Sequence, residues 1–186
     1  MIVYEPSSYQ PLNRSIDVPT AWNGLERIIP AILLDFNVDP VTALEFGVQH
    51  GFSTAALANY FQTVTGVDTF RGDEHAGFGD SDSTMQATKD SLAGFPNVNL
   101  VRSDYKDFIN MFDIHANLAH VDIVHTFEDT YQLGLWAVDH CDCVLFHDTE
   151  SFPDVKKAVA QIALERGLTF HNYPHCHGLG ILRNGR

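Results

Sequence analysis

The chain has 186 residues, 45% of them hydrophobic, which is enough for one sizeable core. The formal net charge of −13 gives a surface that repels nucleic-acid phosphates and anionic lipid, so a nucleic-acid or membrane partner is disfavoured. No apolar run of about 18 residues could span a membrane, and three cysteines without a disulfide pattern favour a reducing, cytoplasmic compartment.

The first 19 residues carry three prolines and little periodicity, so we expect an extended arm ahead of a single domain at residues 20–186. The stretch Trp22–Phe36 is apolar with helical spacing. Pro30 lies inside it and should kink or split the helix, because proline lacks a backbone N–H.

The next segment predicts a strand, a glycine loop and a helix. An apolar strand at Thr42–Phe46 leads into a turn with glycines at 47 and 51, and a helix at Ser53–Phe61 follows, with Ser53 or Thr54 placed to cap it. A second strand, Thr63–Asp68, ends in an acid. Glycines let a backbone approach a ligand closely, and an acid at this strand end can bind both hydroxyls of a ribose. The pattern therefore predicts a nucleoside-containing cofactor.

The spacing of the glycines narrows the choice of cofactor. A dinucleotide fingerprint needs G-x-G-x-x-G, whereas this loop reads G-x-x-x-G with three bulky residues at 48–50. A P-loop needs Gly-Lys-Ser/Thr, which occurs nowhere in the chain. S-adenosylmethionine fits, because its ammonium, carboxylate and ribose can be bound by backbone amides and a strand-end acid. An ordinary strand-turn-helix without a ligand is the alternative.

Strands and helices alternate through the rest of the chain. The expected helices are Ser83–Leu92, Tyr105–His115, Asp129–Asp139 and Asp154–Arg166. The expected strands are Asn97–Arg102, Val121–Thr126, Cys143–Phe146, Leu168–Tyr173 and Gly178–Arg183. This alternation predicts a doubly wound α/β fold with a seven-stranded, mostly parallel sheet. The connection between the last two strands is too short for a parallel crossover, so they should form an antiparallel hairpin.

Candidate catalytic residues lie where strands end. His147 and Asp148 close a buried strand, and His147 is the first candidate for a general base that removes a proton from an attacking hydroxyl. Asp148 could orient a histidine or bind a metal. His125 closes the neighbouring expected strand and is the second candidate, and His75 could reach over the cofactor. The alternative is that His147 is a partly buried histidine with its hydrogen bonds satisfied and that Asp148 caps the next helix.

Several stretches resemble one protein family. Residues 45–54, Glu-Phe-Gly-Val-x-x-Gly-x-Ser-Thr, resemble the first motif of small bacterial methyltransferases that include macrocin-type O-methyltransferases. Residues 66–78 are similar to a segment of a subset found with glycosyltransferases, and residues 144–149 and 177–182 resemble that group's fifth and closing strands. Seven strands with an antiparallel final pair are the architecture of class I S-adenosylmethionine-dependent methyltransferases, which the chain thus resembles.

The resemblance implies a set of cofactor contacts. The residues placed at the cofactor are Glu45, Gly47, Gly51, Ser53, Asp68 and Asp104. Glu45 and Gly47 would contact the methionine end, Gly51 would let the helix start close to it, and Asp68 would take the ribose hydroxyls. Asp104 would lie near the adenine amino group, or would cap the helix that follows it.

One stretch departs from the family pattern. The family carries Asp-Gly-x-His-Thr/Ser-Tyr after the fourth strand, and residues 125–131 align with it only with one residue missing, so that the aspartate falls on Phe127 or Thr126. Mg²⁺ could be bound by Asp148, Glu128 and Asp129, or the metal site is absent.

The function expected from this resemblance is methyl transfer from S-adenosylmethionine to a small molecule, at oxygen. Two alternatives stay open: a protein that binds adenosylmethionine without catalysis, which the altered stretch favours, and a nicotinamide-dependent oxidoreductase, which the glycine spacing disfavours. The arm or a second subunit of a homo-oligomer could cover the site.

Overall fold

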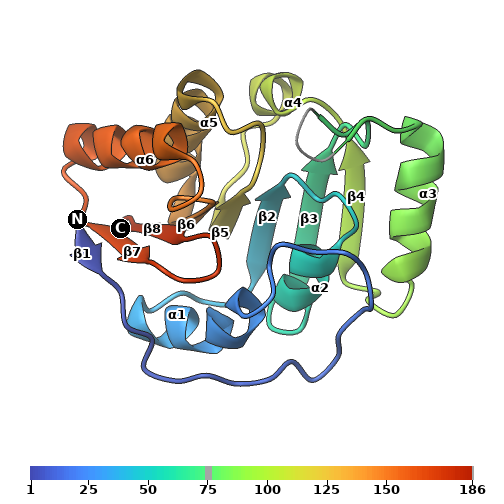
Figure 1. Ribbon diagram of the computed structural model, residues 1–186, viewed down its shortest axis with the longest axis horizontal. Helices are drawn as coiled ribbons and strands as arrows, with labels where there is room; N and C mark the ends of the chain where they lie inside the picture. The colour runs from blue at the N-terminus through green and yellow to red at the C-terminus, as the bar shows by residue number, and fades with distance from the viewer. Residues whose placement is uncertain (74–76, 186) are drawn as a thin grey trace.

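The computed structural model describes residues 1–73 and 77–185. Eight strands form one sheet in the order β1-β7-β8-β6-β5-β2-β3-β4 (Figure 1). The strands are β1 (Ile2–Val3), β2 (Thr42–Phe46), β3 (Thr63–Asp68), β4 (Val98–Arg102), β5 (Ala116–Val121), β6 (Cys141–His147), β7 (Phe170–Tyr173) and β8 (Leu179–Arg183). The helices are η1 (Leu25–Ile28), α1 (Ile29–Asp35), α2 (Phe52–Ala58), α3 (Ser81–Ser91), α4 (Tyr105–Met111), α5 (Phe127–His140) and α6 (Pro153–Arg166).

The sheet confirms the predicted mostly parallel topology with a C-terminal hairpin. Only β8 runs antiparallel, to β6 on one side and to β7 on the other. The eighth strand, β1, was not predicted from the sequence. It extends the sheet in parallel with β7, and the Tyr4 N–H donates to the Asn172 carbonyl at 2.8 Å. The N-terminal residues therefore pair with an edge that the hairpin would otherwise expose.

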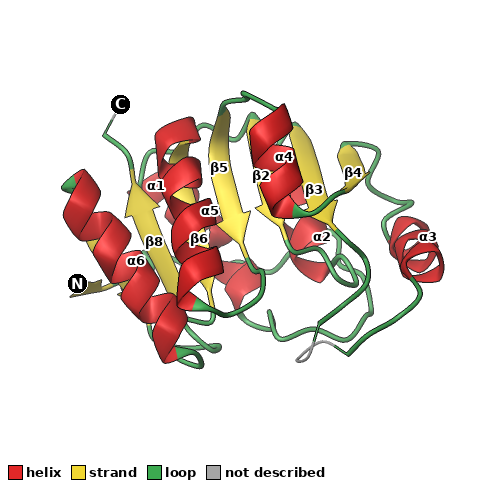
Figure 2. Ribbon diagram, turned by 90° about the horizontal axis from the view of Figure 1, so that it is seen from above, coloured by secondary structure: helices red, strands yellow, loops and turns green. Residues whose placement is uncertain are grey.

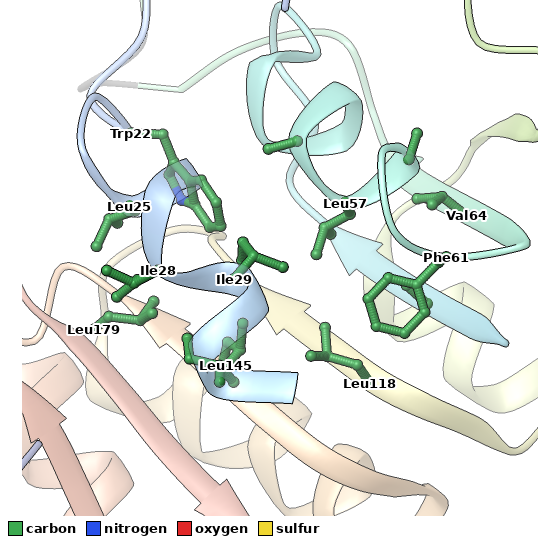
Figure 3. Packing of buried hydrophobic residues seen from close by; sticks show 14 of the residues in the cluster. Trp22, Leu25, Ile28, Ile29, Leu57, Phe61, Val64, Leu118, Leu145 and Leu179 are labelled. Carbon is green, nitrogen blue, oxygen red and sulfur yellow. The ribbon is translucent and has the colours of Figure 1, made fainter. Parts of the chain in front are cut away.

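Two apolar layers cover the sheet. Residues from η1, α1 and α2 pack on one face, and residues from α4, α5 and α6 pack on the other, while α3 lies beside the edge strand β4 (Figures 1 and 2). Trp22, Leu25 and Ile28 gather over Leu145 and Leu179 (Figure 3). Pro30 lies in the first turn of α1, where no intrahelical N–H is lost, and the expected helix is split there into η1 and α1. Among the described residues, no helix is long and apolar enough to cross a membrane.

The start of α2 differs from the expected cap. Gly51 is the N-cap, in a left-handed conformation with φ 86°, and no side chain caps the helix. Ser53 and Thr54 lie inside α2 and are buried. The Thr54 hydroxyl donates to the Glu45 carboxylate instead, so the prediction that Ser53 or Thr54 caps this helix was wrong.

The expected strand Val121–Thr126 is also misplaced. The strand is β5, Ala116–Val121, and residues 122–126 form a loop. Two polar residues interrupt the apolar run and hid the strand, but both have partners: Asn117 hydrogen-bonds Thr42 on β2, and His120 contacts Glu45 on the same strand. The helix expected at Tyr105–His115 accordingly ends at Met111. Asp122, and not Phe127, is thus the residue that follows the strand.

Candidate active site

A cavity of about 690 Å³ opens at the carboxyl ends of the parallel strands. Its lining includes the residues that end or follow four of them, namely Gly47, Asp68, Asp122 and His147. Open parallel sheets bind their ligands at this edge, and the volume lies in the range of small-molecule sites.

The loop after β2 is held against β5 by a close backbone contact. Gly47 has φ 93°, and a Cβ added there would lie 1.7 Å from the carbonyl oxygen of Asp122. The Asp122 N–H also donates to the Phe46 carbonyl at 2.8 Å. Only glycine can occupy this position, so the sequence brings the glycine loop and the end of β5 into one wall of the cavity.

Asp68 ends β3 beneath the same loop. Its Oδ2 accepts the N–H groups of Val48 at 2.7 Å and Gln49 at 2.8 Å, and its Oδ1 accepts the Phe70 N–H at 2.6 Å. A carboxylate has about four lone-pair sites, so three acceptances leave capacity for a ligand. The side chain therefore shapes the glycine loop and also lines the cavity.

The other expected cofactor residues divide into two groups. Gly47 and Ser53 line the cavity together with Asp68, whereas Gly51, Glu45 and Asp104 do not. Asp104 is the N-cap of α4 and accepts the Lys106 N–H at 2.8 Å, while its neighbours Ser103 and Tyr105 reach the cavity. Their contacts with a cofactor stay predictions, and the geometry supports those of the lining residues.

Glu45 has partners of a different kind. It is completely buried, and its carboxylate contacts His120 Nδ1 at 2.9 Å and accepts the Thr54 hydroxyl. Side chains alternate between the two faces of the sheet along β2. Leu44 and Phe46 face the layer of α4, α5 and α6, so the Glu45 side chain between them points toward the layer of α1 and α2. The expected contact of Glu45 with the methionine end is therefore not supported by its position in the structure.

Two aspartates and two histidines form a cluster at the inner end of the cavity. His125 Nε2 lies 2.8 Å from Asp148 Oδ2 and 3.6 Å from Asp122 Oδ1. His147 Nδ1 lies 3.1 Å from Asp122 Oδ2 and 3.3 Å from Asp148 Oδ2. Phe152 stacks on His125 with a centroid distance of 4.0 Å and an interplanar angle of 8°. Each carboxylate thus lies between two imidazoles.

The charges of this cluster stabilise one another. Burial acts to lower the pKa of His147, but Asp122 and Asp148 outweigh it and raise the pKa to about 10. Burial also acts to lower the pKa of His125, but Asp122 and Asp148 outweigh it and raise this pKa to about 9. Burial likewise acts to raise the pKa of Asp148, yet the imidazoles hold it at about 2, and that of Asp122 is also lowered. These shifts favour the protonated form of both imidazoles and the ionised form of both carboxylates.

Asp122 is the member of this cluster that was not predicted from the sequence. It directly follows β5, and Asp122-Ile123-Val124-His125-Thr126 has the Asp-x-x-His-Thr spacing of the family pattern without a gap. The gapped alignment at residues 125–131 arose because the strand was placed five residues too late. With the strand at Ala116–Val121, the spacing alone would have identified Asp122.

The expected metal ligands are not together. The Asp129 carboxylate accepts the Tyr105 hydroxyl at 2.6 Å and pairs with Lys106 at 2.8 Å, and neither it nor Glu128 lines the cavity. The atoms of Asp122, His125 and Asp148 that could bind an ion lie within 4.8 Å of one another. This trio offers carboxylate and imidazole ligands, so Asp122, His125 and Asp148, and not Glu128 and Asp129, are the residues that could hold a divalent ion here.

The N-terminal segment completes the cavity wall. Residues 19–22 line it, and the Trp22 ring meets the His120 ring edge-on at 4.8 Å and lies 6.2 Å from that of His147. On the opposite chain end, His177 also lines the cavity and contacts the Ser151 hydroxyl at 3.0 Å. His75, expected to reach over the cofactor, lies outside the described residues.

Comparisons with known proteins agree with this geometry. A family model described as "Methyltransferase domain" matches residues 44–149, more than half of the chain. A Sinorhizobium fredii protein named "Uncharacterized protein y4gI" is 28% identical in an alignment 160 residues long that covers 79% of this chain. The chain spans only 17% of the length of that curated relative.

Solved structures share the fold at low sequence identity. The O-methyltransferase NovP matches with a TM-score of 0.64 and 15% identity over 83% of this chain and 75% of its own. An SAH-bound Podospora anserina methyltransferase, PaMTH1, matches with a TM-score of 0.62 and 11% identity over 93% and 91%. An rRNA methylase from Streptococcus thermophilus matches with a TM-score of 0.54 and 17% identity over 84% and 96%.

The chain belongs to this methyltransferase-domain family, and its fold is that of class I S-adenosylmethionine-dependent methyltransferases. S-adenosylmethionine fits the described cavity. Gly47 and Ser53 line the cavity beside the loop after β2, and Asp68 offers a carboxylate at the strand end. The nicotinamide and non-catalytic alternatives gain no support from these findings.

Proposed function

We propose that this protein transfers the methyl group of S-adenosylmethionine to a hydroxyl oxygen of a small molecule. The observation that carries the proposal is the convergence of Asp68 and the Asp122, His125, His147 and Asp148 cluster on one cavity. S-adenosylmethionine supplies an electrophilic methyl group on its sulfonium. The protein has to hold a hydroxyl in line with that methyl group and take up the proton that leaves it.

His125 is the better candidate to take up this proton. The side chain of His147 is 1% exposed and its pKa is raised to about 10, whereas that of His125 is 14% exposed with a pKa of about 9. His147, which was the first candidate from the sequence, contacts both carboxylates and positions them. In this proposal His125 accepts the hydroxyl proton, and Asp122 and Asp148 stabilise the imidazolium that results.

A small-molecule acceptor is favoured over RNA, although an rRNA methylase shares the fold. The net charge of −13 repels polyphosphate. A reducing, cytoplasmic location is part of the same proposal, since a methyltransferase of this kind acts where S-adenosylmethionine is made and since the two strand cysteines, Cys141 and Cys143, are buried and free.

Calorimetry with S-adenosylhomocysteine and a methyl-transfer assay on a panel of phenols, glycosides and RNA test the proposal. We expect binding of S-adenosylhomocysteine, transfer to hydroxyl compounds and no transfer to RNA. Binding without transfer to any hydroxyl compound would favour a non-catalytic protein, and transfer to RNA would contradict the proposed acceptor.

A chelator separates two versions of this chemistry. Both carboxylates already contact an imidazole nitrogen, Asp148 at 2.8 Å and Asp122 at 3.1 Å, so we expect activity to persist in excess EDTA. Loss of activity in EDTA and its return with Mg²⁺ or Mn²⁺ would show that a metal acts at this cluster.

A further inference from the structure

The cavity offers no permanently cationic side chain to a ligand. Among the described residues that line it there is no lysine or arginine, whereas four aspartates are present: Asp68, Asp73, Asp122 and Asp148. Sites for phosphate groups use arginine or lysine to pair with the phosphate oxygens. Arg71 lies between two lining residues on the loop after β3, but it is exposed and is not part of the lining.

Two basic side chains on helices beside the cavity are already paired. Lys106 on α4 lies 2.8 Å from Asp129, and Lys156 on α6 lies 2.6 Å from Glu150. The imidazoles of His125 and His147 likewise face Asp148 and Asp122. A phosphorylated ligand would therefore give up its hydration and gain no cationic partner, within the field of an acidic protein.

Apolar side chains occupy the rim of the same cavity. Phe78 is 78% exposed and Val124 is 44% exposed, and both line the cavity. Phe152 adds an aromatic ring stacked on His125. Exposed apolar groups around a concave site mark a surface that a ligand covers, and aromatic groups favour a ligand with a flat or apolar ring face.

We propose that the methyl acceptor is an uncharged hydroxyl compound with an apolar ring face, and that the cavity selects against phosphorylated acceptors. The proposal rests on the methyltransferase function proposed above. It follows from two independent features, the absence of lysine and arginine from the described lining and the apolar rim formed by Phe78, Val124 and Phe152.

A matched pair of acceptors tests this selection. Phenyl glucoside and phenyl glucoside 6-phosphate share the ring and differ in charge. With the S-adenosylhomocysteine-loaded protein, we expect the neutral compound to bind at least about tenfold more tightly, and kcat/KM for methyl transfer to show the same preference. Equal or tighter binding of the phosphate would overturn the charge selection, and binding of neither compound would overturn the ring subsite. Ring binding without methyl transfer would count against the proposed function but not against this selection.

Substitutions in the rim make the test independent of one acceptor. Val124→Lys places an ammonium at the mouth and should raise the phosphate-to-neutral ratio of affinities about tenfold. Val124→Met, the matched control, should change both affinities in proportion and leave the ratio within about twofold. Arg71→Gln should also leave the ratio unchanged. A fall of the ratio in Arg71→Gln, or no rise in Val124→Lys, would overturn the proposal.

Discussion

At the residue scale, the chemistry of this site depends on how protons are shared among four side chains. His125 and His147 each lie beside both Asp122 and Asp148. Such groups titrate as a coupled set, and the carboxylates keep both imidazoles protonated at neutral pH. A histidine in this cluster can therefore act as a base only at a pH well above the ordinary value of about 6.5.

This coupling predicts an alkaline pH profile. A base must be unprotonated, and the pKa of His125 is raised to about 9, so kcat/KM for a hydroxyl acceptor should rise with pH up to about 9. His125→Gln should lower kcat by about 10²–10⁴ and remove the rise. His147→Gln is the control and should keep the rise. A wild-type profile that is flat above pH 7, or full activity in His125→Gln, would contradict a base at His125.

Asp68 gives a prediction for the cofactor. Asp68→Ala removes a carboxylate that lines the cavity and also frees the N–H groups of Val48 and Gln49. Loss of a charge-assisted acceptor costs about 1.5–3 kcal/mol, which is about tenfold to a hundredfold in affinity for S-adenosylhomocysteine by calorimetry. Asp104→Ala, at a helix cap outside the cavity lining, should change this affinity less. The reverse order would show that Asp104 holds the cofactor.

Residue identity alone predicted part of this site. His147, Asp148, Asp68 and Gly47 were found because each ends a clear apolar strand or lies in the glycine loop. Asp122 was missed because His120 and Asn117 mask the strand that it follows. The burial of Glu45 was also not predictable from the sequence. Its partner His120 is 75 positions away, and the two meet only because β2 and β5 are neighbours in the sheet.

At the element scale, most strands and helices were predicted in the right place with errors at their ends, whereas β5 was misplaced and β1 was not predicted. Long apolar runs such as β6, and the helix α6 with its glycine at 167, follow from local patterns. The two-residue strand β1 is stabilised only by pairing with β7 and has no local signal. Gly51 was not recognised as the start of α2, because a glycine N-cap leaves no side-chain pattern to detect.

The glycine loop after β2 gives a prediction for this element. Gly47→Ala would place a Cβ 1.7 Å from the Asp122 carbonyl oxygen at φ 93°, so the loop has to move away from β5. We expect S-adenosylhomocysteine binding to fall below detection by calorimetry. Gly167→Ala is the matched control, because Gly167 also has a positive φ, 64°, but no atom lies within 4 Å of the added Cβ. Retained binding in Gly47→Ala would show that the loop does not form part of the cofactor site.

At the scale of the whole molecule, the strand order explains where the site lies. From β2 the chain proceeds outward through β3 and β4, and it then returns to β5 on the other side of β2. A parallel sheet opens a crevice at such a reversal, beyond the carboxyl ends of the two central strands. Gly47 follows β2 and Asp122 follows β5, so the contact between them marks this crevice. The cofactor loop and the acid–histidine cluster thus meet because of the topology.

The same cluster should govern the stability of the whole protein at high and low pH. The pKa values of His125 and His147 are raised to about 9 and about 10, so their stabilising contribution is fully present below about pH 6.5 and is lost as the pH rises through those values. The pKa of Asp148 is lowered to about 2, so its contribution is present above about pH 4 and is lost as the pH falls toward 2.

The free energy of unfolding, measured with urea between pH 3 and pH 10, should therefore be greatest between about pH 4 and pH 7. Above pH 7 the wild type should lose up to about 1.4 kcal/mol per pH unit for each histidine that keeps its proton in the folded state after the unfolded state has released it. His147→Gln should be less stable than the wild type at pH 7, because Asp122 and Asp148 lose a partner, and its curve should fall less steeply toward pH 10. Titrating groups outside the cluster are common to both proteins, so the difference between the curves reports His147 together with the groups coupled to it, Asp122, Asp148 and His125. Parallel curves above pH 7 would show that His147 is neutral in the folded protein at neutral pH.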